Sequence, residues 1–488
     1  MDEDLAFAPV ETQAGLVRAG DVSPTELVEL YLERIDRHDP ALGAYFTVAA
    51  EQARAAARDA EDRLGSGADL PPYLGVPIAV KDLTDTAGIR TTYGTRAWRD
   101  RVPDRDTEVV HRIKEAGFVI LGKTSTPEFG AAPVTEPPGF PPGRNPWDPS
   151  RTPGGSSGGA AAAAAAALCA VSHGSDAGGS IRIPSALCGC VGIKPTRGRV
   201  STAPLSPELL VVEGSIGRSV ADAAALLDAM EGYATGDPYW VVSPERPFVE
   251  EVAHPPGGLR IAWTAEPFLD GVEVASANRD VARDAADLLA DLGHAVVEGR
   301  PAWSAASATR EMAIVGAALS ARADLPPDDE LDPVNRFMLE AGRMLSAAQY
   351  LTMIEQLGAE AREAVRFFDA VDVLVTPTVP IPAPPVGEYT TLAEMEDLRS
   401  YLMESVLGGT MPRFGWLAAF TAPWNVTGQP AVSVPLAVDA DGLPVGVQLV
   451  GRAGAEATLV RLAGQLERER PWAARRPPPG RGAPSATG

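Results

Sequence analysis

The stretch from Arg151 to Ser180 decides the fold and reads RTPGGSSGGAAAAAAAALCAVSHGSDAGGS. Two clusters of glycine and serine flank a run of eight alanines, Ala160 to Ala167. Alanine has the highest helix propensity, so the run predicts a helix that begins at the first glycine cluster. Its small side chains would let this helix pack closely against a sheet. Consecutive backbone N–H groups before a serine are what an oxyanion hole requires, so we expect the chemistry at the second cluster.

Segments on both sides of this stretch alternate between strand and helix patterns. Residues 74–82 (LGVPIAVKD) are interpreted as a buried strand that ends in Lys81, and 106–116 as a helix before another buried strand at 118–122. Ser23-Pro24-Thr25-Glu26 is a capping box that begins a helix, which Asp39-Pro40 is expected to end. Such alternation is typical of an α/β protein. Further helices are predicted over 51–64, 219–230, 275–292 and most of 305–368, and strands over 259–264, 295–298, 371–376 and 445–450.

Composition and charge exclude several classes of protein. The hydrophobic fraction of 45% is ample for a packed core, and the net charge of −23 argues against a nucleic-acid partner. No basic, apolar leader and no apolar run of ~18 residues is present, so we expect a cytoplasmic protein that does not contact a membrane. The three cysteines lack zinc-site spacing, which predicts buried reduced thiols and no metal: Cys169, Cys188 and Cys190.

The first glycine cluster fits two known loop motifs only in part. Gly155 to Gly159 matches the G-x-S-x-G nucleophile elbow, but that motif needs an apolar strand before it, and Asn145 to Pro153 contains three prolines. No lysine follows in the G-K-[ST] order of a phosphate loop. The histidines are placed at predicted helix ends or in loops and interpreted as surface or capping residues: His38, His111, His173, His254 and His294. A serine nucleophile activated by a lysine base is the candidate chemistry that remains.

Lys81 is the candidate base. An ordinary lysine, with a pKa of ~10.4, is almost wholly protonated at neutral pH, but burial lowers a lysine pKa because it disfavours the charged form. The end of an apolar strand is an environment of that kind. From the residues alone, a structural ion pair with Asp82 or Asp176 is an equally open interpretation of Lys81.

Three segments resemble the amidase signature family, in the family's order: LGVPIAVKD (74–82), PGGSSGG (153–159) and GSDAGGSIRIPS (174–185). The similarity extends through GIKPTRGRVS (192–201) and, more loosely, to FTAPWNVTGQPAVSVPL (420–436) and GLPVGVQLVG (442–451). The resemblance implies one large domain over 1–472, with a central mixed β-sheet flanked by α-helices and the core signature at about 70–235. The proline- and arginine-rich tail, 473–488, is expected to be disordered.

The resemblance also implies roles for individual residues. The family's Ser–cisSer–Lys triad corresponds to Ser180 as nucleophile, Ser156 as relay and Lys81 as base, with a cis peptide bond between Gly155 and Ser156. The implied oxyanion-hole donors are the N–H groups of Ala177, Gly178, Gly179 and Ser180, and the implied supporting residues are Ser157, Ser175, Asp176 and Arg182. Ser175 stands where the family commonly has threonine, so a hydroxyl is kept. No metal or cofactor is implied.

The implied reaction is hydrolysis of a C–N bond through an acyl-enzyme. VTEPPGFPPGRNPWD (134–148) and RPWAARRP (470–477) most resemble family members that hydrolyse nylon oligomers or aryl acylamides. They predict a small apolar or aryl amide, anilide, cyclic or linear amide, or carbamate as substrate, in a pocket lined by Tyr93, Trp416, Phe420 and Trp424. The alternative is the A-type subunit of a tRNA-dependent glutamine amidotransferase. A homodimer stays open, as does the role of residues 305–368.

Overall fold

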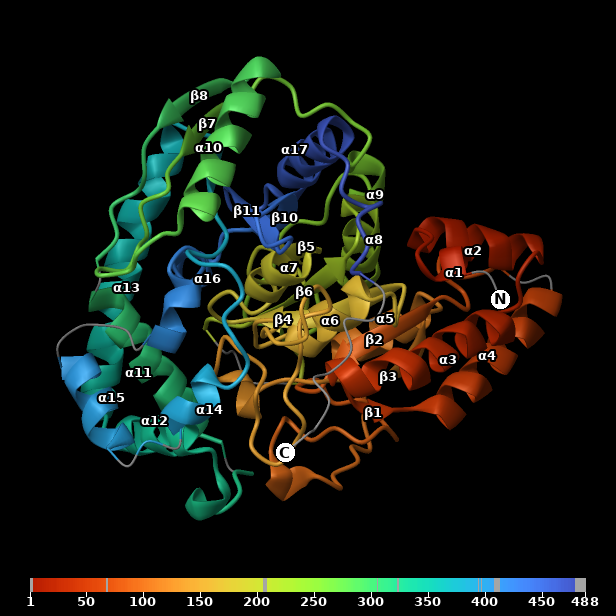
Figure 1. Ribbon diagram of the computed structural model, residues 1–488, viewed down its shortest axis with the longest axis horizontal. Coiled ribbons are helices and arrows are strands. Elements are labelled where there is room, and N and C mark those ends of the chain that lie inside the picture. The colour runs from red at the N-terminus through yellow and green to blue at the C-terminus, as the bar shows by residue number, and fades with distance from the viewer. Residues whose placement is uncertain are drawn as a thin grey trace.

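A mixed β-sheet runs through the whole protein (Figure 1). The computed structural model describes residues 3–66, 69–204, 209–304, 306–322, 324–393, 395, 397–407 and 413–478. In these residues one sheet of eleven strands has the order β1-β3-β2-β4-β6-β5-β10-β11-β9-β7-β8, with helices packed around it. The strands are β1 Tyr45–Val48, β2 Pro77–Lys81, β3 Val119–Thr124, β4 Val171–Asp176, β5 Val191–Lys194, β6 Val212–Gly217, β7 Arg260–Trp263, β8 Ala295–Glu298, β9 Val373–Pro377, β10 Ala431–Val438 and β11 Pro444–Gly451. The predicted α/β fold with a central mixed sheet is confirmed.

Strand directions bring the sequence motifs together at one place in the sheet. β2 is parallel to both β3 and β4, whereas β4 is antiparallel to β6. Lys81 ends β2, and Asp176 ends the neighbouring β4. Because carboxyl ends of parallel strands meet at the same edge, the lysine and the second glycine–serine cluster lie side by side.

The helices that were predicted begin and end close to the predicted bounds, and several further helices, such as α2 and α17, were not predicted. They are α1 Glu3–Ala6, α2 Val10–Ala19, α3 Pro24–Leu42, α4 Ala50–Gly65, α5 Glu108–Glu115, α6 Gly158–Ala165, α7 Arg182–Cys188, α8 Val220–Met230, α9 Phe248–Glu251, α10 Ser276–Asp291, α11 Ala306–Ser320, α12 Pro333–Arg343, α13 Ala347–Arg366, α14 Glu388–Ala393, α15 Leu398–Leu407, α16 Pro423–Thr427 and α17 Glu456–Glu469. The Ser23–Glu26 capping box is present, but α3 runs through Pro40 to Leu42. The helix ends at Gly43, whose φ of 57° is left-handed. Pro40 therefore lies in the last turn, and its missing N–H group weakens the backbone hydrogen bonding only there.

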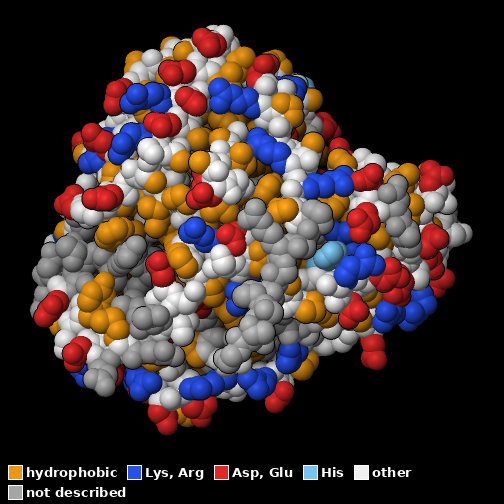
Figure 2. Space-filling view, in the orientation of Figure 1, with side chains coloured by type: hydrophobic (Ala, Val, Ile, Leu, Met, Phe, Trp, Pro, Cys, Tyr) orange, Lys and Arg blue, Asp and Glu red, His pale blue; other side chains and the backbone are white. Residues whose placement is uncertain are grey.

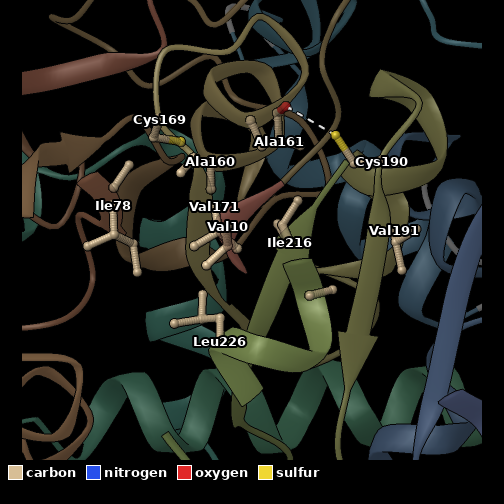
Figure 3. Packing of buried hydrophobic residues seen from close by; sticks show 14 of the residues in the cluster. Val10, Ile78, Ala160, Ala161, Cys169, Val171, Cys190, Val191, Ile216 and Leu226 are labelled. Carbon is tan, nitrogen blue, oxygen red and sulfur yellow. Dashed lines mark hydrogen bonds between the residues drawn. The ribbon is translucent and has the colours of Figure 1, made fainter. Parts of the chain in front are cut away.

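The alanine helix α6 is the centre of the core. Every residue from Gly158 to Ala165 is buried, and the helix packs on β2, β3, β4 and β6. Figure 3 shows Ala160 and Ala161 among Ile78, Val171 and Ile216, with the Cys190 thiol 3.7 Å from the Ala161 carbonyl oxygen. The predicted close packing of this helix on a sheet is confirmed. All three cysteines are buried and free, as expected.

The surface, the helices and the chain end bear on the predictions about charge, membrane contact and the tail. On the face shown in Figure 2, acidic and basic side chains are interspersed. Among the described helices, none combines the length and apolarity that crossing a bilayer requires. Most of the tail predicted to be disordered lies outside the described residues, which end at 478.

Candidate active site

Lys81 is fully buried at the end of β2. Its Nζ atom lies 2.8 Å from Ser156 Oγ, 3.1 Å from Ser175 Oγ and 3.2 Å from the Ser175 carbonyl oxygen. Burial lowers the pKa of Lys81 to about 7, against the opposing charges of Glu213 and Asp176. No carboxylate of the described residues forms an ion pair with Lys81, so the interpretation as a structural pair with Asp82 or Asp176 does not hold.

The loop before α6 presents Ser156 to this lysine. The peptide bond between Gly155 and Ser156 is cis. A Cβ atom at Gly155 would lie 2.6 Å from the backbone nitrogen of Val134, so only glycine fits there. The neighbouring Ser157 is turned elsewhere: its hydroxyl donates to the Ser175 carbonyl oxygen at 3.1 Å, and its N–H donates to the Ser180 carbonyl oxygen at 3.1 Å. Ser157 therefore ties the two glycine clusters together.

Ser180 follows β4 at the end of the second cluster. It is partly exposed, and its hydroxyl has no hydrogen-bond partner among the described residues. The N–H groups of Ala177, Gly178 and Ser180 likewise have no acceptor in the part of the chain that is described. The Gly179 N–H instead donates to Asp176 Oδ1 at 2.7 Å. Three of the four N–H groups implied as oxyanion-hole donors are thus free to bind a substrate oxygen. The fourth, that of Gly179, is hydrogen-bonded to Asp176 within the turn.

A buried ion pair fixes this turn to the rest of the protein. Arg182, at the start of α7, is fully buried and donates to both carboxylate oxygens of Asp176, at 3.0 Å from Nε and 2.9 Å from Nη2. Burial alone would raise the pKa of Asp176, but Arg182 outweighs it and holds that pKa well below the usual range. The remaining Arg182 N–H groups donate to Thr421 O, Gln448 Oε1 and Asn425 Oδ1.

Sequence reasoning missed the roles of three of these residues. Thr421 donates its hydroxyl to the Gly178 carbonyl oxygen at 2.6 Å, and Asn425 donates to the Asp176 carbonyl oxygen at 2.8 Å. Gln448, on β11, accepts from Arg182 at 2.7 Å. The signal was available: each is a buried polar residue in an apolar stretch, where a polar group needs a fixed partner.

The aromatic residues predicted to line a pocket are not brought together. Phe420 and Trp424 are fully buried and pack on Phe268, with ring centroids 6.4 and 5.5 Å from it. Tyr93 packs instead on Trp98 at 5.3 Å, in a separate cluster with Phe129. Trp416 is half-buried.

Two apolar groups of side chains lie next to the catalytic candidates. Phe129, of the Tyr93 cluster, precedes Gly130, where an added Cβ would lie 3.3 Å from Ser156 Oγ. On the other side, Ala177 packs against a cluster from the 209–210 segment, α11, α13 and α16: Leu210, Ile314, Leu357 and Val426. Helices α11 and α13 thus contribute apolar surface beside the turn that carries Ser180, a role that the sequence did not reveal.

Two histidines differ from their prediction. His173 is neither at a helix end nor on the surface: it is fully buried in β4, and its Nε2 lies 2.9 Å from Glu213 Oε2. His294 lies in the loop after α10, as predicted, but it is buried rather than on the surface and contacts Gln465. The burial of both histidines was not predicted because their partners, Glu213 and Gln465, are far away in sequence. The described residues contain no group of three or more His, Cys, Asp or Glu side chains that would hold a metal ion.

We predict that Arg182→Met destabilises the protein by about 3–5 kcal/mol, because Asp176 would become an uncompensated buried charge. The measurement is the midpoint of thermal unfolding. Arg260→Met is the matched control, since Arg260 is about half exposed and Asp372 keeps a second ion pair with Arg452, so the midpoint should barely change. Equal effects of the two substitutions would contradict the structural role given to Arg182.

Comparison with known proteins agrees with this geometry. The family model described as Amidase matches residues 26–460. A putative amidase of Synechocystis is 39% identical over 463 residues, covering 93% of this chain and 87% of the relative. The 6-aminohexanoate-cyclic-dimer hydrolase of Paenarthrobacter ureafaciens is 37% identical over 495 residues, covering 95% of each chain.

Solved structures give the same result over nearly the whole chain. The structure of 6-aminohexanoate cyclic dimer hydrolase complexed with substrate has a TM-score of 0.88 and 34% identity, covering 97% of this chain and 99% of that one. A bacterial aryl acylamidase has a TM-score of 0.84 at 26% identity, with 96% and 97% covered. The A-type subunit of the glutamyl-tRNA(Gln) amidotransferase from Thermotoga maritima has a TM-score of 0.76 at 30% identity, with 96% of each covered. The chain therefore belongs to the amidase signature family, whose hydrolases act on the C–N bonds of amides.

Proposed function

We propose that the protein hydrolyses amides through a Ser–cisSer–Lys triad made of Ser180, Ser156 and Lys81. The observation that carries this proposal is the 2.8 Å contact between the buried Lys81 amine and Ser156 Oγ. Desolvation makes that amine a usable base: at a pKa of ~10.4 only about one lysine in a thousand is neutral near pH 7.4, whereas at a pKa of about 7 more than half are.

In the proposed mechanism, protons move from Ser180 to Ser156 and from Ser156 to Lys81 as Ser180 Oγ attacks the amide carbon. The resting hydroxyls of the two serines are not hydrogen-bonded to each other, and we expect that bond to form in the substrate complex, as catalytic hydrogen bonds often do. The N–H groups of Ala177, Gly178 and Ser180 stabilise the oxyanion. The proton returns to the leaving amine, and water then hydrolyses the acyl-enzyme by the same relay.

The proposed substrates are small apolar or aryl amides, including anilides, cyclic or linear amides and carbamates. Support comes from the apolar cluster against Ala177 and from the aromatic cluster of Tyr93, Trp98 and Phe129 beside Ser156. The names of the similar proteins, a cyclic-dimer hydrolase and an aryl acylamidase, point the same way. Tyr93 and Trp416 remain predicted pocket residues. Phe420 and Trp424 are assigned to the core that supports the pocket.

The amidotransferase alternative has no specific observation in its favour. The experiment that tests the proposal offers the purified chain chromogenic anilides, esters and carbamates, with glutamine supplied separately. Hydrolysis of an anilide or carbamate without any partner protein supports the proposal. Ammonia release from glutamine alone, with no anilide or carbamate cleaved, would contradict it.

We expect Ser180→Ala to abolish turnover of every amide that the wild type cleaves. Alanine fits the same turn, so the midpoint of thermal unfolding should stay near that of the wild type. Initial rates and melting curves are the two measurements. A variant that keeps even a tenth of the wild-type rate would show that Ser180 is not the nucleophile.

The two neighbouring serines should differ. Ser156→Ala removes the group between nucleophile and base and should cost about 10²–10⁴-fold in kcat. Ser157→Ala removes one hydrogen bond to a carbonyl oxygen and should cost roughly tenfold or less. Comparing kcat of both variants on one substrate checks this order, and a reversed order would transfer the relay role to Ser157.

The rate should follow the neutral fraction of Lys81. The amine becomes charged as the pH falls through its pKa of about 7, so kcat/KM should be half-maximal there and stay high in the alkaline range. Lys81→Ala and Lys81→Arg should both be inactive, because a guanidinium cannot accept a proton. The exposed Lys114, paired with Asp106, provides the control Lys114→Arg, which should keep its activity. Substantial activity in Lys81→Arg would mean that position 81 supplies only charge.

A further inference from the structure

The buried pair of His173 and Glu213 has no part in the relay described above. Their side chains are 0% and 5% exposed, and His173 Nε2 lies 2.9 Å from Glu213 Oε2. A carboxyl group is almost never buried to this extent without a partner or a functional role. The partner of Glu213 is His173, and the position of the pair in the sheet indicates its role.

Glu213 lies directly across from the serine that holds the catalytic lysine. In the antiparallel pairing of β4 and β6, Ser175 is opposite Glu213 and His173 is opposite Ser215. Opposed residues of an antiparallel pair place their side chains on the same face of the sheet. Ser175 contacts Lys81 Nζ through both its hydroxyl and its carbonyl oxygen. Glu213, on β6, is therefore separated from β2 and Lys81 only by β4, whose Ser175 contacts the amine.

The hydrogen bonds of His173 indicate the charge of the pair. His173 Nε2 lies 2.9 Å from Glu213 Oε2, whereas Nδ1 is buried and has no partner among the described residues. A second proton on Nδ1 would be a buried donor without an acceptor, which costs about 1–3 kcal/mol. We therefore assign to the pair a neutral imidazole that donates from Nε2 and an ionised carboxyl, which together carry one net negative charge.

The other charged groups near Lys81 are already engaged. Asp176 is held by Arg182 in a bidentate pair. On β3, Lys123 donates to the Thr84 carbonyl oxygen and to Thr86, and Asp82 accepts from Thr92. In the described part of the chain, no lysine or arginine forms an ion pair with Glu213. The negative charges of Glu213 and Asp176 both keep the pKa of Lys81 from falling further.

We propose that Glu213, oriented by His173, is a positioning residue that controls the protonation of Lys81 and thereby sets the lowest pH at which the enzyme works. The carboxylate stabilises the protonated amine, so Lys81 releases its proton only near neutral pH. Below that range the base is switched off. This inference rests on the proposed role of Lys81 as the base.

The test measures how fast phenylmethylsulfonyl fluoride inactivates the full-length protein between pH 5 and 10, so that no substrate need be known. The reaction forms the Ser180 Oγ–S bond and expels fluoride, and the serine proton passes to Lys81. In Glu213→Gln, the pH of half-maximal inactivation should fall by roughly one unit, because the negative charge is lost while an acceptor for His173 is kept. Glu251→Gln is the control: Glu251 is also buried but pairs with Arg246 and Arg461, and it should show no shift.

His173→Gln is the second variant, and it can overturn the proposal even if Glu213→Gln does not fold. The new amide keeps a neutral donor to Glu213, so the pH of half-maximal inactivation should not change. A rise in that pH would mean that His173 is charged and cancels the charge of Glu213, which overturns the proposal. An unshifted profile in folded Glu213→Gln overturns it as well.

Mass spectrometry of the labelled wild type separates the proposed triad from the proposed role of Glu213. Reagent on a residue other than Ser180 would refute the proposed triad, whereas an unshifted profile with Ser180 labelled refutes only the role of Glu213.

Discussion

The ion pair between Arg182 and Asp176 is the interaction on which the site depends. It is fully buried, and it joins the end of β4 to the start of α7 and, through Thr421, Asn425 and Gln448, to α16 and β11. Two isolated charges in the interior would be costly, but here every N–H group and both carboxylate oxygens have partners. The turn that carries Ser180 is thereby fixed by segments more than 230 residues apart in the sequence.

Lys81 illustrates the opposite use of burial. Arg182 is compensated by a nearby carboxylate, whereas Lys81 is surrounded by two hydroxyls and a carbonyl oxygen. Dipoles of this kind solvate an ammonium only in part, so the neutral amine gains relative to the charged form. The protein thus pairs one buried cation, Arg182 on α7, with a carboxylate, and leaves the other, Lys81 on β2, without an ion pair and with a pKa of about 7.

Part of this arrangement was readable in the sequence. The alanine run and the glycine clusters indicated α6, and the lysine at the end of an apolar strand indicated a base. β4 and β6 were missed because their sequences, VSHGSD and VEGSIG, contain glycine and polar residues that hide the strand pattern. The contact of His173 with Glu213 spans 40 residues and follows from the antiparallel pairing of those strands. Local patterns carry no information about such a contact. For Thr421 and Asn425 they show a polar residue in an apolar stretch, but not the partner to which it is hydrogen-bonded.

The alanine side chains of α6 also bear on the distance between Ser156 and Lys81. The helix packs directly on β2, which carries Lys81, and its amino end follows Ser156 and Ser157. The alanine side chains are buried where α6 meets β2, and close-packed interiors transmit rather than absorb added volume. Enlarging one of these side chains is therefore expected to separate Ser156 from Lys81 without touching either. Residues remote from any substrate would thus determine whether the proposed relay serine and the proposed base stay within hydrogen-bond distance.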